Sequence, residues 1–439
     1  MKRKMKYLVS ENMAYRDDGK IESLDVYAPR RVNLGIVIIV LVMMAFGIVM
    51  LFSASMPKAF TAQGNSMYYV VHQGAFLLLG FIAALILTFI PLKAFDKWPV
   101  TLAVYLSAIG MALLTLSMGK VINGARRWII IGGVSIQPSE YIKVAIVYSI
   151  AGYRSFVQRL RKKGGLKAKH TSQALFDAFM DITLPGILVL ICLLIVVLQP
   201  HMSCFLILSA ISLICFLCCG IPLSSWLRGS AILLAIITVV GGIFYLSMPG
   251  AQKKKLEKNF AHVVTRLNIF ETMNSDEEET EEKEKKADDD DTYQIEQSII
   301  AIGSGGMTGV GFGNSRQKYM YLPEAHNDYV YSIICEELGF VGGLIIMLLF
   351  WAFALAGFLV AWQADSLFTR ILVTGYTSLL TLQAFLNIGV ATGAIPPTGI
   401  TLPFFSYGGT ANFFFMIAVG MILSVSRSGR KRKTVKLVV

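Results

Sequence analysis

Four polar segments of this chain hold residues that could carry out chemistry, and each adjoins a long apolar run. The first segment extends from Asn123 to Lys143 and begins with two adjacent arginines, Arg126 and Arg127. Guanidinium groups suit bidentate contact with phosphate oxygens, so this pair is a candidate phosphate-binding element. The alternative interpretation is that both are ordinary loop charges in contact with lipid headgroups.

The same segment continues with Gln137, Pro138, Glu140 and Lys143. Proline is favoured in the first turn of a helix, and an acid there complements the positive end of the helix dipole. Glu140 and Lys143 are three residues apart, so on a helix they share a face and can form an ion pair. Such a pair inside a membrane span marks either a functional site or a structural lock between helices.

The second segment combines an acidic run with a glycine-rich stretch. Residues 276–291 are mostly acidic, and the last four, 288–291, adjoin Tyr293. Blocks of like charge are usually solvated, so most of this run is not expected to take part in chemistry. The glycines at 303–313 lack the Gly-Lys-Ser/Thr sequence of a nucleotide P-loop. They indicate either a close approach of the backbone to a ligand or a flexible re-entrant connection.

The third segment contains a basic group followed by an acid, an imidazole and a second acid: Arg316, Gln317 and Lys318, then Glu324, His326 and Asp328. Positive charge on the external face of the membrane runs against the positive-inside rule, which favours a binding role. The acids and the imidazole could hydrogen-bond to sugar hydroxyls, bind a metal or cap the helix that follows. A single histidine is more often a structural residue.

The fourth segment, residues 396–410, contains three prolines, three glycines and Ser406. It cannot form a continuous helix. Irregular backbone at membrane depth is tolerated only where protein buries it or a cavity solvates it. We therefore expect this uncharged loop to fold back into the outer mouth of a helical bundle, and not to be a plain connection.

These segments belong to a strongly apolar chain of 439 residues, of which 55% are hydrophobic and 15% charged. An ordinary soluble domain has an apolar share of about 45–50%, glycine included, so this class is excluded. The net charge of +12 is concentrated at the termini and in one loop, which is typical of anchoring at the cytoplasmic face and not of nucleic-acid binding. The six cysteines lie in or beside apolar runs without metal-ligand spacing, so we expect them to serve packing.

Recurring apolar runs of about 20 residues predict an all-α polytopic membrane protein with ten transmembrane helices. The expected spans are 33–54, 68–91, 98–118, 138–155, 183–199, 204–220, 226–247, 328–362, 371–395 and 409–427. The eighth is longer than a bilayer needs, so its first turns, through Glu336 and Glu337, are expected at the interface or in a protein-lined cavity.

Lysine and arginine in the loops predict which ends are cytoplasmic. The basic N-terminus, the loop 154–169 and the basic C-terminus all fall on the cytoplasmic side of a ten-span chain. Residues 1–32 and 428–439 are then cytoplasmic tails, and residues 33–427 form the membrane domain. Within it, residues 248–327 form a large extracytoplasmic loop between helices 7 and 8.

Together the segments resemble the SEDS family of bacterial cell-wall glycosyltransferases, which includes FtsW, RodA and SpoVE. The resemblance covers about residues 33–427 and depends on four stretches in the same order: NGARRWI…QPSEYIK, YQIEQSIIAIGSGG, GNSRQKYMYLPEAHNDYVYSIICEELG and PPTGITLPFFSYGGT. The third stretch is closer to FtsW or SpoVE than to RodA, which favours division or sporulation over elongation.

The resemblance implies a peptidoglycan glycosyltransferase that polymerises lipid II into β-1,4-linked strands with inversion, releasing undecaprenyl diphosphate, in cell division. It also implies a catalytic aspartate shortly before Tyr293, although the family's usual aspartate-proline context is replaced here by the acidic insertion. Counting back from Tyr293 indicates Asp288, with Asp289, Asp290 and Asp291 as alternates. This carboxylate would take the proton of the acceptor hydroxyl.

The residues expected to bind substrate are Arg126, Arg127, Gln137, Glu140, Lys143, Arg316, Gln317, Lys318, Glu324, His326, Asp328 and Ser406. The basic members would stabilise the departing diphosphate, and a divalent cation, Mg²⁺ or Mn²⁺, could assist. No organic cofactor is expected. A second departure from the family pattern is His201, which follows Pro200 where the family often has an acid.

Expected partners are lipid II, the nascent glycan strand, a class B penicillin-binding protein, other divisome proteins and membrane lipids, with no nucleic acid. The expected location is the bacterial cytoplasmic (inner) membrane, with several passes and both termini cytoplasmic. One alternative is a lipid II flippase, because spans with buried charge and broken helices also suit a transporter. The other is a non-catalytic scaffold that recruits a penicillin-binding protein.

Overall fold

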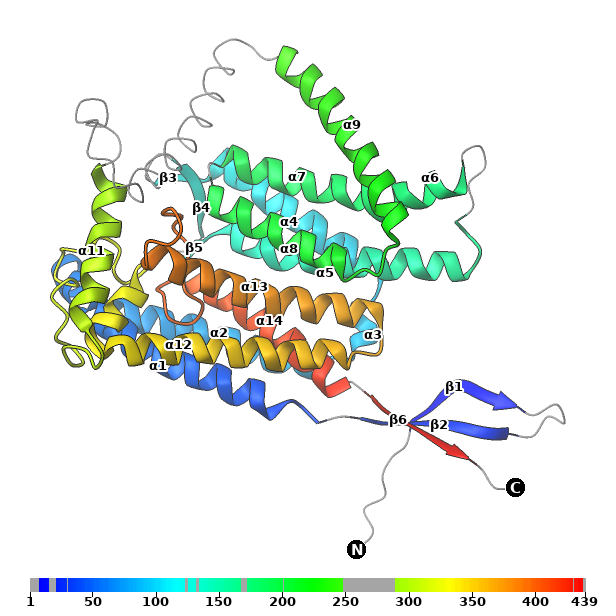
Figure 1. The fold of residues 1–439 in the computed structure, drawn as a ribbon, viewed down its shortest axis with the longest axis horizontal. Coiled ribbons are helices and arrows are strands. Elements are labelled where there is room, and N and C mark those ends of the chain that lie inside the picture. Colours follow the sequence, from blue (N-terminus) through cyan, green and yellow to red (C-terminus); the bar gives the residue numbers. More distant parts are fainter. Residues whose placement is uncertain are drawn as a thin grey trace, which may run out of the picture.

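A computed structural model of the chain describes a long bundle of helices (Figure 1). The described residues are 8–15, 21–29, 31–122, 125–131, 134–166, 172–199, 201–247, 289–428 and 430–436. Within these ranges, the ten predicted spans coincide with helices α1 (Leu34–Gln63), α2 (Tyr68–Phe89), α4 (Trp98–Met118), α5 (Pro138–Lys162), α6 (Gln173–Ala178) continued by the π-helix η1 (Phe179–Thr183) and α7 (Leu184–Leu198), α8 (Met202–Leu217), α9 (Leu223–Ser247), α12 (Val330–Trp362), α13 (Leu367–Ala391) and α14 (Gly409–Ser428).

Among the described residues, eight of these helical units are long and apolar enough to cross a membrane by length and composition, so this is a multi-pass membrane protein. The other two predicted spans correspond to α8, which has 16 residues, and to α5. Helix α5 carries charged residues at both ends, and most of its residues up to Ser155 are buried by other helices. Because protein and not lipid surrounds α5, it does not need the apolar composition of a lipid-facing helix.

Close helix packing in the bundle depends on small residues. A Cβ added to Gly375 of α13 would lie 2.4 Å from Val147 of α5, and one added to Gly420 of α14 would lie 2.6 Å from the Cα of Ala84 in α2. In lipid, such close contacts replace the hydrophobic effect as the source of helix association. The six cysteines are free thiols, and all of them except the partly buried Cys218 are buried, which agrees with a role in packing.

The two ends of the bundle differ in structure (Figure 1). One end carries the short strands β3 (Lys120–Ile122), β4 (Ala125–Ile131) and β5 (Val134–Ile136), together with α11 (Asp289–Gly305). The other end carries α3 (Leu92–Phe95). It also carries a sheet in which the N-terminal strands β1 (Leu8–Tyr15) and β2 (Ile21–Pro29) pair with the C-terminal β6 (Arg430–Lys436), in the order β1-β2-β6. The two tails, predicted as separate segments, therefore meet at one end of the molecule.

Helix α12 is broken at Gly339, which adopts φ 68° and ψ −167°. This left-handed φ is available to glycine at little cost. The glycine-rich stretch packs onto the break: the N–H of Val310 donates to the carbonyl of Glu336 at 3.0 Å, and the N–H of Phe340 donates to the carbonyl of Gly306 at 2.8 Å. The glycines at 303–313 thus let two backbone segments approach each other. The first turns of α12, which were predicted at the membrane interface or in a protein-lined cavity, are surrounded by protein.

Candidate active site

The two adjacent arginines lie on strand β4, where successive side chains point to opposite faces. Arg126 is exposed, and its guanidinium donates to the backbone carbonyls of Leu116 at 3.2 Å and Ser117 at 3.4 Å. Arg127 is partly buried, and its Nε donates to the carbonyl of Gln199 at 3.4 Å. Of the two predicted phosphate ligands, Arg127 is the one that turns toward the interior of the bundle.

The predicted ion pair between Glu140 and Lys143 is present in the first turns of α5. The ammonium of Lys143 lies 2.7 Å from the carboxylate of Glu140, and the two side chains are only 3% and 7% exposed. The same ammonium donates to Oε1 of Gln383 on α13 at 2.8 Å, and the amide of Gln383 donates to the carbonyl of Thr401 at 3.3 Å. The pair therefore connects α5 to α13 and to the fourth polar segment.

His201 lies between α7 and α8 and contacts the same group. Its Nε2 is 3.5 Å from the amide nitrogen of Gln137, the residue that precedes α5. Burial, followed by the positive charges of Arg127 and Lys143, lowers the pKa of His201 to about 3, so the imidazole is neutral. We call this group the Arg127 cluster: Arg127, Gln137, Glu140, Lys143, His201 and Gln383.

Asp328 lies just before α12 and is held by α13 and the fourth segment. The side-chain amide of Asn387 donates to the carbonyl of Asp328 and to that of Ile400, both at 2.6 Å. Gly399, at φ 61°, faces the Asp328 carboxylate so closely that a Cβ there would lie 3.3 Å from Oδ2. Burial and the charge of Glu324 raise the pKa of Asp328 to about 7, while the charge of Arg127 lowers it. Asp328 is thus electrostatically linked to the Arg127 cluster.

Glu324 and His326 belong to a separate contact with α1 and α2. Lys58 of α1 lies 2.9 Å from the carboxylate of Glu324. Burial raises the pKa of Glu324, but the hydrogen bond and charge of Lys58, together with His326 and Asn327, hold this pKa below its usual value. His326 is buried, with its ring 4.7 Å from that of Tyr69, and burial lowers the pKa of His326 to about 4. This is the environment of a structural histidine.

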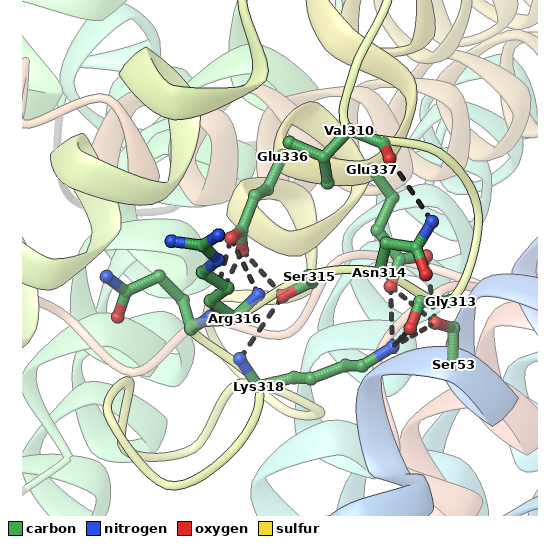
Figure 2. A network of polar contacts seen from close by, with 10 residues as sticks. Ser53, Val310, Gly313, Asn314, Ser315, Arg316, Lys318, Glu336 and Glu337 are labelled. Atoms are coloured by element: carbon green, nitrogen blue, oxygen red, sulfur yellow. Dashed lines mark hydrogen bonds and ion pairs between the residues drawn. The ribbon is translucent and has the colours of Figure 1, made fainter.

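The basic group of the third segment divides into buried and exposed members (Figure 2). Lys318 is fully buried, and its ammonium contacts the Glu337 carboxylate at 2.8 Å, Ser53 Oγ at 3.1 Å and the carbonyl of Gly313 at 2.6 Å. A side chain with these contacts positions the loop between α11 and α12. In this conformation it is not available to a phosphate, so direct substrate contact by Lys318 is not supported.

Glu336 holds the residues beside Lys318 (Figure 2). Its carboxylate accepts from Ser315 Oγ at 2.5 Å and from the backbone N–H of Arg316 at 2.8 Å. Gln317 is partly buried, and its backbone N–H lies 3.4 Å from the same carboxylate. The Arg316 residue itself is exposed, so it is the member of this group that a substrate could reach.

The loop 396–408 folds back into the bundle, as predicted. Leu402, Phe404, Phe405 and Ser406 have no exposed surface. The hydroxyl of Ser406 accepts from the N–H of Leu402 at 2.7 Å, so this serine, predicted to bind substrate, closes a turn of its own loop. Its direct contact with substrate is therefore not supported either.

The predicted catalytic base, Asp288, lies outside the described residues. Its alternates Asp289, Asp290 and Asp291 form the start of α11, whose remainder packs against α12 and α13. The hydroxyl of Ser298 donates to the carbonyl of Ala391 at 2.6 Å, which fixes α11 at the C-terminal end of α13. The acidic alternates and Arg127 thus belong to segments at the same end of the bundle (Figure 1).

The structure brings together five of the predicted site residues: Arg127, Gln137, Glu140, Lys143 and Asp328. It adds three that local patterns did not indicate, namely His201, Gln383 and Asn387. Gln383 and Lys143 are 240 residues apart in the sequence, so only the packing of α13 against α5 reveals their contact. For His201 there was one signal in the sequence: a histidine follows Pro200 where the family often has an acid.

No group of three or more histidine, cysteine, aspartate or glutamate side chains is placed to hold a metal ion within the residues that the structure describes. The divalent cation remains a prediction.

Comparisons with known proteins give one consistent result. A family model described as "Cell cycle protein", for FtsW, RodA and SpoVE, matches residues 33–431. Stage V sporulation protein E of Bacillus subtilis is 31% identical over 399 residues, which cover 91% of this chain and 98% of that protein. The probable peptidoglycan glycosyltransferase FtsW of Halorhodospira halophila is 33% identical over 382 residues, 86% of each chain.

Two solved structures share the fold. One, from a study of polymerization and crosslinking by a peptidoglycan synthase complex, has a TM-score of 0.62 at 23% identity and covers 91% of this chain and 98% of that one. The other, the rod shape determining protein RodA of Thermus thermophilus, has a TM-score of 0.58 at 23% identity and covers 91% and 97%. From the extent of the family match, from relatives above 30% identity along nearly the whole chain and from this shared fold, we conclude that the protein belongs to the FtsW/RodA/SpoVE family, the SEDS family that its four polar segments resemble.

Proposed function

We propose that this protein is a peptidoglycan glycosyltransferase that polymerises lipid II into β-1,4-linked glycan strands with inversion and releases undecaprenyl diphosphate. The observation that carries the proposal is the placement of Asp328 and Arg127 at one end of the bundle (Figure 1), where the charge of Arg127 acts on the Asp328 carboxylate. It provides a carboxylate that can accept a proton beside a cation that can face a phosphate. Glycosyl transfer from a diphosphate donor requires both groups.

Asp328 has the properties of the base. A general base works best when its pKa lies near the working pH, and burial brings the pKa of Asp328 to about 7. This assignment is an alternative to the sequence-based choice of Asp288, which lies outside the described residues and stays a prediction. The clamp by Asn387 fixes the backbone at Asp328, so the carboxylate is presented from a rigid element and not from an acidic run of like charges.

The reaction balances with these groups. The acceptor hydroxyl of lipid II loses its proton to the Asp328 carboxylate, and its oxygen forms a bond to the anomeric carbon of the donor strand. The bond from that carbon to the diphosphate oxygen breaks, and the diphosphate leaves with the electron pair. Attack opposite the leaving group inverts the anomeric carbon. The positive charge of Arg127 stabilises the departing anion.

Glu140, Lys143 and Gln383 support this site without a chemical step of their own. Glu140 neutralises part of the charge of Lys143. Gln383 connects Lys143 to Thr401 by hydrogen bonds. The pair lies in the first turns of α5, beside the end of the bundle that carries β4 and not near the middle of the helix. A transporter usually places its site near the midplane, so this position favours chemistry at one face over flipping of lipid II.

We place the β3–β5 and α11 end outside the cell membrane and the two tails in the cytoplasm, in the bacterial inner membrane. The basic residues of both tails support this orientation. The relatives include a sporulation protein and FtsW proteins, which supports a role in division or sporulation. A class B penicillin-binding protein and other divisome proteins are proposed partners. Helix α9, whose apolar window is only 6% buried, offers surface to lipid or to a partner's helix.

Polymerisation of labelled lipid II by the purified full-length protein with its transpeptidase partner tests the proposal. The partner's own active site is blocked, so product requires this chain. Asp328→Asn should lower the rate by about 10²–10⁴-fold. Matched variants of the acidic run, Asp288→Asn, Asp289→Asn, Asp290→Asn and Asp291→Asn, should remain active.

Each contrary outcome is informative. Loss of activity in one of the acidic-run variants, with full activity of Asp328→Asn, would return the base to the acidic run. No polymer from the wild-type complex would favour the scaffold or the flippase, and transport of labelled lipid II in liposomes would separate these two.

A further inference from the structure

The end of α11 and the loop after it carry an apolar surface that the proposed mechanism does not use. Five large apolar side chains of this stretch are exposed: Ile299, Ile300, Met307, Val310 and Phe312. No charged residue lies between Glu296 and Arg316. Single exposed apolar side chains are ordinary, but an uncharged group of them marks contact with lipid or with another protein. We call this group the 299–312 surface.

The loop part of the 299–312 surface continues into the exposed face of α12. Helix α11 lies across the end of the bundle and not along it (Figure 1). The chain then pairs with α12, where the N–H of Val341 donates to the carbonyl of Met307 at 3.3 Å. Phe340 and Val341 are 59% and 47% exposed, and the exposed face extends along α12 through Leu344, Ile345 and Leu348. Exposed apolar side chains of a spanning helix are the ones that lipid surrounds, so the loop adjoins lipid.

The break in α12 at Gly339 indicates the depth of this contact. From Phe340 to Trp362 the helix is unbroken, and at about 1.5 Å per residue this part alone can cross a hydrocarbon core of about 30 Å. Trp362 is exposed at the far end of the helix and is of the aromatic type that favours a membrane interface. The boundary of the hydrocarbon core therefore lies close to Gly339, at the level of the loop.

The backbone of the loop meets the requirement for contact with lipid. Hydrocarbon offers no hydrogen bonds, so backbone polar groups that enter it need partners within the protein. The N–H of Gly309 donates to the carbonyl of Gly305 at 2.8 Å, and the N–H of Gly311 donates to the carbonyl of Glu337 at 3.0 Å. With the bonds of Val310 and Phe340 described above, they tie the loop to the break in α12. A loop surrounded by water has no such requirement.

We propose that the 299–312 surface lies in the outer leaflet of the bilayer, at the boundary between lipid headgroups and acyl chains. Its occupant is lipid, because the surface is level with the start of the membrane-crossing part of α12 and continues its lipid-facing side. The outer position follows from the orientation proposed above. Part of the segment expected as an extracytoplasmic loop thus returns to the membrane. Arg316, the next charged residue, is then held at the level of the headgroups.

Collision of nitroxide spin labels with oxygen and with a water-soluble nickel chelate tests this placement. The full-length protein is placed in phosphatidylcholine nanodiscs, with a label at Met307→Cys or Phe312→Cys. Asn314→Cys, an exposed site just beyond the surface, is the control for water, and Leu348→Cys on α12 is the control for lipid. The oxygen-to-nickel ratio at Met307 and Phe312 should exceed that at Asn314 by at least about threefold, because a polar complex enters an apolar region at a cost.

Labelling of the wild-type protein gives the background, since its cysteines are buried apart from the partly buried Cys218. If Met307→Cys or Phe312→Cys does not fold, Val310→Cys supplies a further site with the same expectation. Ratios at these sites equal to that at Asn314 would overturn the proposal. Sites that are open to the nickel chelate in the isolated protein, and closed to both probes only with the transpeptidase partner, would assign the surface to a protein interface instead.

This experiment uses no substrate, so its result is separate from the proposed function. Polymerisation of lipid II by a protein whose 299–312 surface is open to water would remove only the membrane placement. A lipid-exposed surface in a protein that makes no polymer would remove only the proposed function.

Discussion

The ammonium group of Lys318 lies 2.8 Å from the carboxylate of Glu337, and neither side chain has any exposed surface. Ser53 of α1 also bonds to this carboxylate, at 2.6 Å, so three segments meet at one buried ion pair (Figure 2). The pair fixes the loop between α11 and α12 to the broken start of α12. The segment that presents Asp328 follows directly in the chain.

Removal of one partner of this ion pair should destabilise the protein. Lys318→Met leaves the Glu337 carboxylate buried without its cation, which costs about 3–5 kcal/mol. The double variant Lys318→Met with Glu337→Gln removes both charges and should recover part of the loss. Thermal unfolding of the detergent-solubilised protein measures the differences. Arg316→Met, at an exposed position two residues away, should stay within about 0.5 kcal/mol of wild type. A double variant less stable than Lys318→Met would contradict the account.

The two adjacent arginines should differ in their effect on polymerisation. Arg127→Gln removes the charge that faces the departing diphosphate and should lower kcat by about 10²–10³-fold. Arg126→Gln removes contacts to two carbonyls at the end of α4 and should change kcat by less than about threefold. Steady-state rates with labelled lipid II compare this pair of neighbours. Equal losses of kcat in the two variants would contradict the prediction that only Arg127 acts on the departing diphosphate.

The rate of polymerisation should rise with pH as Asp328 loses its proton. The base must be ionised, and burial places the pKa of Asp328 at about 7, so the rising limb of the kcat profile should lie near that value. The negative charge of Glu324 raises this pKa, so Glu324→Gln should shift the limb to lower pH. Initial rates between about pH 5.5 and about pH 9 locate the limb.

The control for this profile is Glu296→Gln, which removes an exposed acid from α11. Its rising limb should coincide with that of the wild type. A Glu324→Gln profile that coincides with the wild type as well would show that Asp328 does not govern the limb.

Asn387 should matter for both activity and stability although it carries no charge. Asn387→Ala removes two hydrogen bonds of 2.6 Å, to the carbonyls of Asp328 and Ile400. We expect a stability loss of about 1–3 kcal/mol and a fall in kcat that exceeds the change in KM, because the base loses its support. Unfolding and steady-state kinetics on one preparation test this. Asn314→Ala, an exposed asparagine with a local bond of 3.3 Å, is the matched control and should leave both values unchanged.

The membrane architecture could be predicted from the sequence because it depends on local composition. About 20 apolar residues are needed to cross the hydrocarbon core, and each predicted span coincides with a helix. The exception in composition is instructive. Helix α5 was predicted as a span together with the other apolar runs, and its charges are tolerated because other helices bury them.

The residues of the site were only partly predictable. Glu140 and Lys143 could be paired from their spacing on one helix, since side chains three residues apart share a face. Arg126 and Arg127 are equivalent in the sequence, and only the strand and its place beside α7 give them different surroundings. The sequence suggested Lys318 as a phosphate ligand, but in the structure its ammonium is paired with Glu337.

The sequence alone therefore determined the helices, the family and the kinds of side chain available, because each of these depends on near neighbours in the chain. Tertiary structure decided which carboxylate has a cation beside it and which cations are already neutralised. The physical reason is that charge and burial act through space. Asp328 acquires its pKa from Glu324, from Arg127 on a distant strand and from the helices that enclose it, and no window of the sequence contains all of these.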